Sequence, residues 1–341
     1  MRILVLVAIL IIAGIMSSVS FACATQSVES LQDLNKNNNK IYVVCSIPDL
    51  VPIVKEVGGS AVEVRAIMPP GSDPHAFTVS AKTVSEFENA KLIVLADSSL
   101  ISFEGRIKKA YPDKCLDLSD YEKFGLKLDS FPGYKNCPHG YWLKLENGIA
   151  IAKAVEERLS KIDPSKSWYF KSNLQLFESQ VREAEKVIAK QSRVKGLYCV
   201  AAVPGVCYVA ENSGMKVGAV LMEESAGFAS GAEMMQLEKE LSSSKYACVI
   251  VPEFAKDTKV GQLASQLARD CGKPVVYVKF VMSTPNDTYV GIAYYNAMSL
   301  NSAGHIEKAG NTTPGFSALS SIVAIAGVLA LALVRGGVGG R

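Results

Sequence analysis

A single apolar stripe near the middle of the chain constrains the fold more than any other feature. Its residues recur at alternating spacings of four and three: Phe170, Leu174, Phe177, Val181, Ala184 and Ile188. This spacing places them on one face of an α-helix, and Asp163-Pro164-Ser165 supplies a helix-start signal. A helix of about 25 residues is roughly 38 Å long. We expect it, within residues 163–193, to join two lobes, although an ordinary long surface helix would show the same stripe.

Strand and helix patterns alternate on both sides of this helix. Lys40–Ile47 and Lys91–Ala96 predict buried strands before it, and Gly196–Val203 predicts the first strand after it. Such alternation indicates parallel sheets covered by helices. We therefore predict an α/β fold with two similar lobes, residues 40–162 and 194–300. A ligand cleft should lie between them, because ligands bind outside the carboxyl ends of the strands in open α/β sheets.

The N-terminal end of the chain is not expected to join this fold. An uncharged run, Ile3–Met16, follows Arg2 and precedes Ala22-Cys23-Ala24, so residues 1–24 predict a secretory signal peptide. Cys23 could instead be a lipidated cysteine, but the residues before it form a poor lipobox. Residues 25–39 have too few apolar side chains to fold and predict a polar tether.

The C-terminal end predicts an anchor. A polar linker, residues 301–316, ends in Pro-Gly-Phe and is followed by an uncharged run, residues 317–334, and a basic tail, residues 335–341. As a helix this run spans about 27 Å, marginally enough for a bilayer core. The order of these parts resembles the archaeal PGF-type sorting signal, which implies that the helix is removed and a lipid anchor is left. A retained anchor helix is the alternative, and both place the folded part outside the cell, anchored at the membrane.

Composition excludes several classes of function. The net charge of +3 and the lack of any long Lys/Arg run argue against nucleic acid as a partner. The signatures HExxH, GxSxG and the P-loop are missing from the sequence, so we expect no enzyme. We also expect a monomer. The eight cysteines contain no CxxC pair and predict no particular disulfide connectivity.

Two prolyl-histidines are the candidate binding residues. His75 lies in "GSDPHAF", just after a predicted strand, and His139 lies in "NCPHGYWL" before a predicted helix. Neutral imidazole is the commonest protein ligand of transition metals, so the two could share one ion in the cleft. A solvated loop histidine is the alternative for each. His305, in the polar linker, is expected to be solvated.

At these histidines the sequence resembles a known family, the metal-specific solute-binding proteins of ABC importers for zinc and manganese. "PPGSDPHAFTVSAKTVSEFENAKLIVLADSSL" is similar to its first-histidine segment, and "CPHGYWLKLENGIAIAKAVEERL" to its second. The resemblance covers residues from Lys40 to Leu300. It implies two lobes on a connecting helix, His75 and His139 as ligands of a divalent ion, zinc or manganese, and an ABC permease as the partner.

The sequence also departs from the family pattern. Cys137 stands where the family has an aspartate before the second Pro-His pair, and Val203 and Lys279 stand at the two ligand positions of the second lobe. Valine cannot bind a metal, and a lysine ammonium would repel one. Cys207 or Glu253 could replace the lost ligands, although each could equally be structural.

The prediction is therefore an extracellular solute-binding protein with a degenerate site for zinc or manganese. One alternative is a family member that has lost its metal and binds another ligand or a surface partner. A second alternative is a secreted zinc hydrolase with Glu253 as general base.

Overall fold

The structure is a computed structural model that describes residues 40–72, 74–75, 77–222 and 231–304. The predicted signal peptide, tether, PGF motif, anchor segment and basic tail lie outside the described residues, and so does His305. In the part of the chain that is described, no helix combines the length and the apolar character needed to cross a bilayer.

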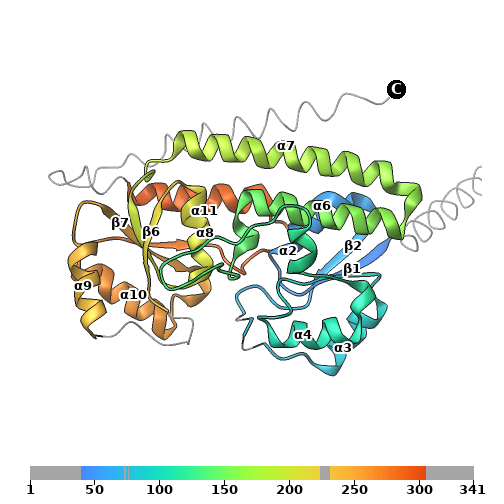
Figure 1. Ribbon diagram of the computed structural model, residues 1–341, viewed down its shortest axis with the longest axis horizontal. Helices are drawn as coiled ribbons and strands as arrows, with labels where there is room; N and C mark the ends of the chain where they lie inside the picture. The colour runs from blue at the N-terminus through green and yellow to red at the C-terminus, as the bar shows by residue number, and fades with distance from the viewer. Residues whose placement is uncertain (1–39, 73, 76, 223–230, 305–341) are drawn as a thin grey trace, which may run out of the picture.

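Two four-stranded parallel sheets form the centres of two lobes (Figure 1). The first sheet has the order β2-β1-β3-β4 and the second has the equivalent order β6-β5-β7-β8. The strands are β1 (Ile41–Cys45), β2 (Val62–Ala66), β3 (Leu92–Val94), β4 (Cys115–Leu116), β5 (Tyr198–Ala201), β6 (Lys216–Val220), β7 (Tyr246–Pro252) and β8 (Val275–Val278). All strand pairs are parallel, as the alternation of strand and helix patterns predicts.

Helices cover both sheets and connect the lobes. The α-helices are α2 (Leu50–Gly58), α3 (Ala81–Asn89), α4 (Ser102–Ala110), α5 (Leu118–Glu122), α6 (Leu145–Ile162), α7 (Ser167–Gln191), α8 (Cys207–Asn212), α9 (Gly231–Leu241), α10 (Lys259–Asp270) and α11 (Tyr289–Ala303). Short 3-10 turns are η1 (Gly59–Ala61), η2 (Pro112–Lys114), η3 (Tyr141–Leu143), η4 (Pro164–Lys166), η5 (Pro204–Val206) and η6 (Glu253–Ala255).

The long helix α7 runs along one edge of the molecule, over both lobes (Figure 1). It packs against α2 and α6 of the first lobe and against α11 of the second. Five of the six residues in the predicted stripe are buried, and Leu174 is partly buried. The apolar stripe therefore joins the lobes, and the prediction of two αβ lobes linked by one long helix is confirmed.

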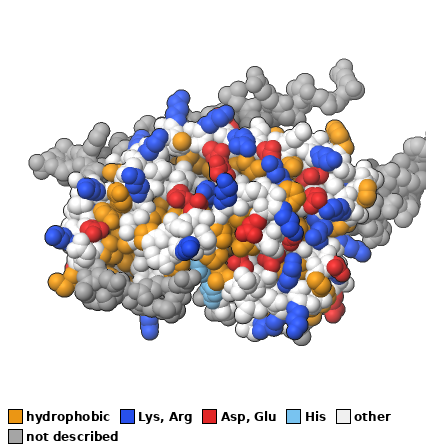
Figure 2. Space-filling model, in the orientation of Figure 1, with side chains coloured by type: hydrophobic (Ala, Val, Ile, Leu, Met, Phe, Trp, Pro, Cys, Tyr) orange, Lys and Arg blue, Asp and Glu red, His pale blue; other side chains and the backbone are white. Residues whose placement is uncertain are grey.

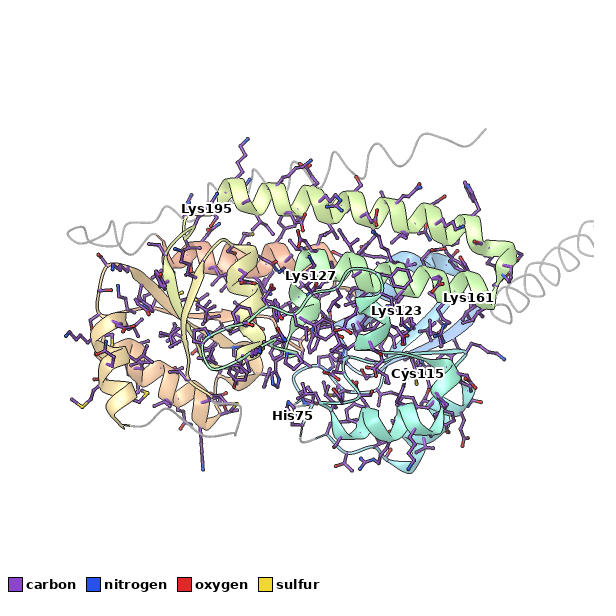
Figure 3. All side chains as sticks on the ribbon, viewed as in Figure 1. His75, Cys115, Lys123, Lys127, Lys161 and Lys195 are labelled. Atoms are coloured by element: carbon purple, nitrogen blue, oxygen red, sulfur yellow. The ribbon has the colours of Figure 1, made fainter. Side chains whose placement is uncertain are left out.

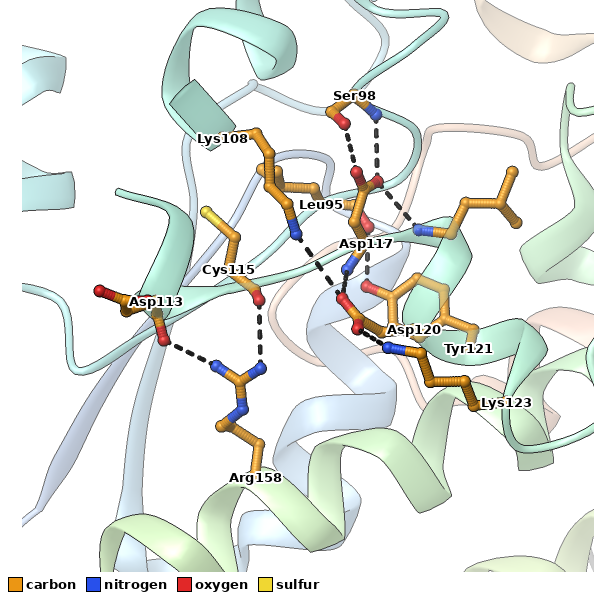
Figure 4. Close-up of polar contacts among 11 residues, drawn as sticks. Leu95, Ser98, Lys108, Asp113, Cys115, Asp117, Asp120, Tyr121, Lys123 and Arg158 are labelled. Atoms are coloured by element: carbon orange, nitrogen blue, oxygen red, sulfur yellow. Dashed lines mark hydrogen bonds and ion pairs between the residues drawn. The ribbon is translucent and has the colours of Figure 1, made fainter. Parts of the chain in front are cut away.

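Polar contacts hold the shortest strand of the first sheet, β4 (Figure 4). Arg158 on α6 donates to the carbonyl of Cys115 at 3.3 Å. Directly after the strand, Asp117 caps α5 in a capping box with Asp120, and its carboxylate also accepts from the N–H of Ser98 at 3.0 Å. These bonds fix a strand that is too short to be held by its ladder alone, and they position the loop after β3 on the cleft side.

Strand order places the ligand-binding edge. In each sheet the strand order switches from one side to the other between two parallel neighbours, β1 and β3 in the first sheet and β5 and β7 in the second. Loops that leave the carboxyl ends on either side of such a switch point form a crevice. Residues after β3 line one cleft together with residues after β5 and β7, so the two crevices open toward each other.

Candidate functional site

An open cleft with a volume of about 640 Å³ lies between the two lobes. Figure 2 shows pale-blue histidine side chains at the hollow between the lobes, with hydrophobic side chains close by. The described residues that line the cleft come from both lobes: Pro74, His75, Leu100, Ile101, Tyr134, His139, Trp142, Val203, Pro204, Gly205, Met222, Phe254, Ala255, Thr258, Lys259, Val260 and Phe280.

The structure brings the two predicted histidines together. The ring centroids of His75 and His139 are 5.7 Å apart, and the ring of Tyr134 lies 5.9 Å from that of His139. His75 lies on the loop between β2 and α3, at the lower margin of the gap between the lobes in Figure 3. Both imidazoles belong to the first lobe and line the cleft.

Glycine next to His139 allows the lobes to approach closely. Gly140 has a φ of 75°, a left-handed conformation that other residues adopt at a cost. A Cβ atom at Gly140 would lie 2.2 Å from the carbonyl oxygen of Gly205 in the second lobe. The turn that carries His139 therefore touches the opposite lobe through its backbone.

Burial keeps the imidazole of His139 neutral. The pKa of His139 falls to about 4, chiefly through burial and also through the nearby His75, while the carboxylate of Asp97 opposes the shift. Asp97 itself accepts from the N–H and hydroxyl of Ser99, at 2.9 and 2.6 Å. At neutral pH, His139 therefore presents a free nitrogen lone pair, as a metal ligand must.

The described residues of the second lobe that line the cleft are mostly apolar. Val203 ends the segment after β5 and lines the cleft. Lys279 does not line the cleft: its Nζ lies 3.0 Å from Asp287 and 5.1 Å from the ring centroid of Tyr295. The pairing with Asp287 argues against the expectation that the Lys279 ammonium repels an ion in the cleft.

Neither candidate replacement ligand lines the cleft. Cys207 is fully buried at the start of α8, where burial raises the pKa of its thiol well above the ordinary value. A thiolate, the form that binds metal, is therefore disfavoured. Glu253 on η6 accepts a hydrogen bond from Tyr295. Among the described residues, no group of three or more His, Cys, Asp and Glu side chains could hold an ion.

Sequence reasoning missed Asp49, whose carboxylate accepts hydrogen bonds from both lobes. Asp49, which is buried, accepts from Trp142 Nε1 at 3.1 Å, from the N–H of Val281 at 2.7 Å, and from the N–H and hydroxyl of Ser283 at 3.1 and 2.6 Å. A signal was available, because Asp49 follows the carboxyl end of β1 much as His75 follows β2.

Sequence reasoning also missed the aromatic wall. Phe280 stacks on Trp142 with ring centroids 5.8 Å apart and also contacts Phe254 at 6.0 Å. The next residue, Val281, has a φ of 56°, which is an outlier for a β-branched residue and costs on the order of 1–3 kcal/mol. Its N–H and carbonyl are bonded to Asp49 and Gly71 of the first lobe, so contacts between the lobes hold Phe280 in the cleft.

Comparison with known families decides which family the chain belongs to. The profile of the family described as ZnuA, zinc-uptake complex component A, periplasmic, matches residues 43–303. The chain belongs to the ZnuA family. This match includes both lobes, the connecting helix and both cleft histidines.

Individual relatives and solved structures are similar to this chain over most of its length. The metal ABC transporter substrate-binding lipoprotein SloC of Streptococcus mutans is 24% identical over 292 residues, 82% of this chain and 91% of its own length. The periplasmic zinc-binding protein TroA of Treponema pallidum has the same fold, with a TM-score of 0.63 over 78% of this chain and 99% of its own, at 21% identity. FpvC of Pseudomonas aeruginosa, solved in complex with Mn²⁺, gives a TM-score of 0.63 over 80% of this chain and all of its own, at 15% identity.

The ZnuA assignment also decides between classes of function. Its curated relatives are substrate-binding proteins of ABC transporters and not enzymes, so the prediction of a non-enzyme is confirmed. The alternative of a secreted zinc hydrolase also loses its general base, since Glu253 does not line the cleft.

Proposed function

We propose that this protein binds a divalent transition metal, zinc or manganese, through His75 and His139 and passes it to an ABC permease in the membrane. The observation that carries the proposal is the pairing of the two imidazoles on one wall of the interlobe cleft, 5.7 Å apart between ring centroids. Two imidazoles that share one tetrahedral ion at Zn–N distances near 2.0 Å have centroids about 5 Å apart. A small rotation of either side chain would bring both onto one ion.

The proposed site has fewer protein ligands than a complete one. Zinc sites in proteins take four ligands, or three with an open position. The second lobe contributes Val203 at one expected position, and Lys279 at the other is paired with Asp287. We therefore expect bare zinc to bind more weakly than it would in a site with four protein ligands.

Titration calorimetry on the purified protein tests the proposal. His75→Ala and His139→Ala should each abolish the binding of zinc, because one remaining imidazole cannot hold the ion. The third histidine offers a matched control: His305→Ala, in the linker outside the described residues, should leave the affinity unchanged. Unchanged zinc affinity in both cleft variants would refute the metal site.

A second candidate function is a family member that has lost metal binding and holds another ligand or a surface partner in the same cleft. The apolar second-lobe wall around Val203 favours it. The same titration separates the two proposals, because this candidate requires that wild-type protein bind neither zinc nor manganese.

We further propose that the protein acts outside the cell and is anchored by its C-terminal segment, with the Pro-Gly-Phe motif as a PGF-type sorting signal. The support is the order of linker, tripeptide, apolar run and basic tail in the sequence. A chain truncated at Thr313 should then be released into the medium as folded protein. If it remained on the membrane, lipidation at Cys23 would be the better account, and SloC is itself described as a lipoprotein.

A further inference from the structure

We propose that the cleft takes its metal as a chelate: a divalent ion bound to a small anionic organic chelator that carries an apolar arm. This inference rests on the proposed function, since it assigns His75 and His139 to the same ion. It adds the identity of the remaining ligands, which come from the cargo, since the described second-lobe residues that line the cleft offer no carboxylate, thiol or imidazole.

The size of the cleft is the first argument. Its volume of about 640 Å³ falls within the range of sites for small organic molecules, roughly 300–1,000 Å³. One water takes about 30 Å³ in the liquid, so an ion with two waters would fill only a small part of the cleft. A chelate of modest size would fill the remainder.

Charge is the second argument. No carboxylate is found among the described residues that line the cleft; its polar groups include the two imidazoles, the hydroxyl of Thr258 and the ammonium of Lys259. A bare divalent ion on two neutral imidazoles would keep its full double charge beside an apolar wall, which is unfavourable. An anionic chelator neutralises the charge of the ion when it enters the cleft. Lys259 at the N-terminus of α10 would attract a carboxylate of the chelator at the rim.

The opposite wall is the third argument. Facing the histidines, the second lobe presents Val203, Phe254, Val260 and Phe280, none of which can bind a metal. Phe280 is fixed by stacking on Trp142, while Phe254 is only partly buried and can cover a ligand. A wall of this kind binds the apolar part of an organic molecule.

The coordination arithmetic is consistent with this cargo. A chelator with one amine and two carboxylates occupies three positions on the ion. His75 Nε2 or Nδ1 and the equivalent nitrogen of His139 would each displace one water, and zinc accepts the resulting total of five ligands. The chelator's arm, attached to the amine, could then extend toward Phe254.

Isothermal titration of the full purified protein with defined probes tests the proposal. The probes are zinc chloride, the preformed one-to-one complexes of zinc with N-benzyliminodiacetate and with N-methyliminodiacetate, and N-benzyliminodiacetate without zinc. The two complexes present the same donor atoms and differ only in the apolar arm. We expect the benzyl complex to bind about tenfold more tightly than the methyl complex, and more tightly than bare zinc, with no binding of the zinc-free chelator.

Variants assign the binding to the residues named. His75→Ala should abolish the binding of both complexes. Phe254→Ala should remove most of the difference in affinity between the benzyl and methyl complexes. Met235→Ala, an exposed apolar residue on α9 outside the cleft lining, is the matched control and should change neither.

The possible failures are distinguishable. If bare zinc binds as tightly as the benzyl complex, or if the two complexes bind equally, the chelate proposal is overturned while the proposed metal site stands. If the zinc-free chelator binds as well as its complex, the chelate proposal falls. If no probe binds at all, the chelate proposal and the zinc site both fall.

Discussion

The imidazole of His139 illustrates how single residues are tuned in this cleft. Its ordinary pKa of 6.5 falls to about 4, mainly through burial. Between these two values the unfolded chain binds a proton that the folded chain does not, so stability rises with pH across this window and is lost as the pH falls from 6.5 toward 4. Neutral imidazole at neutral pH is also the form that binds metal.

NMR of the histidine ring protons checks this directly. With three histidines in the chain, His139→Gln identifies the His139 signal by its loss. That signal should stay constant between pH 7.5 and 5.5 and titrate near pH 4. A midpoint near 6.5 would show that the cleft wall does not exclude water from this ring.

Asp49 is the second residue whose surroundings predict a large effect. It accepts four hydrogen bonds from Trp142, Val281 and Ser283. In Asp49→Asn the side-chain NH₂ group would replace one carboxylate oxygen and would point at N–H or O–H groups, which cannot accept a hydrogen bond. We therefore expect the free energy of unfolding to fall by about 2–4 kcal/mol. Urea denaturation measures it, and Asp257→Asn, an exposed acid, should stay within about 0.5 kcal/mol of wild type.

At the scale of elements, α7 is more than a connection. Phe177 is buried on its inner face and packs against the ring of Tyr289 on α11, with centroids 5.5 Å apart. The hydroxyl of Tyr289 in turn donates to the carbonyls of Trp142 and Lys144 in the first lobe, at 2.8 and 2.9 Å. One helix face is thus linked through a single tyrosine to both lobes.

Phe177→Ala should therefore destabilise the whole molecule and not one lobe. Removing a buried Phe side chain costs about 3–5 kcal/mol, and we expect a single unfolding transition at lower denaturant in which both lobes are lost together. Its neighbour Leu176 is largely exposed, so Leu176→Ala serves as the control with little change. Two separate transitions in the Phe177 variant would show that α7 does not couple the lobes.

Sequence reasoning was most reliable for elements and least reliable for contacts between lobes. The stripe from Phe170 to Ile188 predicts α7, because a helical period of apolar residues over this length can be recognised without knowing what the helix packs against. The strand-end rule and the family resemblance predict His75 and His139 in one cleft, and the structure places their ring centroids 5.7 Å apart. The contact of Lys279 with Asp287 could not be predicted, because no local pattern shows which way a long side chain turns.

The sequence also did not show which side chains near the cleft are buried and which line it. Cys207 was a candidate donor because it follows Val203 by one helical turn, yet it is packed inside the second lobe. The aromatic wall of Phe254 and Phe280 depends on Val281, whose left-handed backbone is imposed by Asp49 from the other lobe. Conformations that are held by distant parts of the chain leave little trace in the sequence around them.

For the whole molecule, these links predict limited movement. With α7 along both lobes and Asp49 bonded across them, the lobes should rock only slightly when ligand binds. Small-angle scattering should give a radius of gyration of about 18 Å for the folded part, changing by less than about 1 Å on addition of zinc. A larger fall would contradict the role of α7 as a rigid strut.

The position of Asp49 also bears on the order of events as the chain is made. Its hydrogen-bond partner Ser283 lies 234 residues further along the chain. The ribosome therefore synthesises Asp49 long before the groups that donate hydrogen bonds to its carboxylate. Until the last strand and the loop beyond it arrive, the charge must stay hydrated, and the first lobe cannot seal its interior at that edge. The nascent chain is thereby kept loose, and its final compaction waits for the segment that carries Val281 and Ser283.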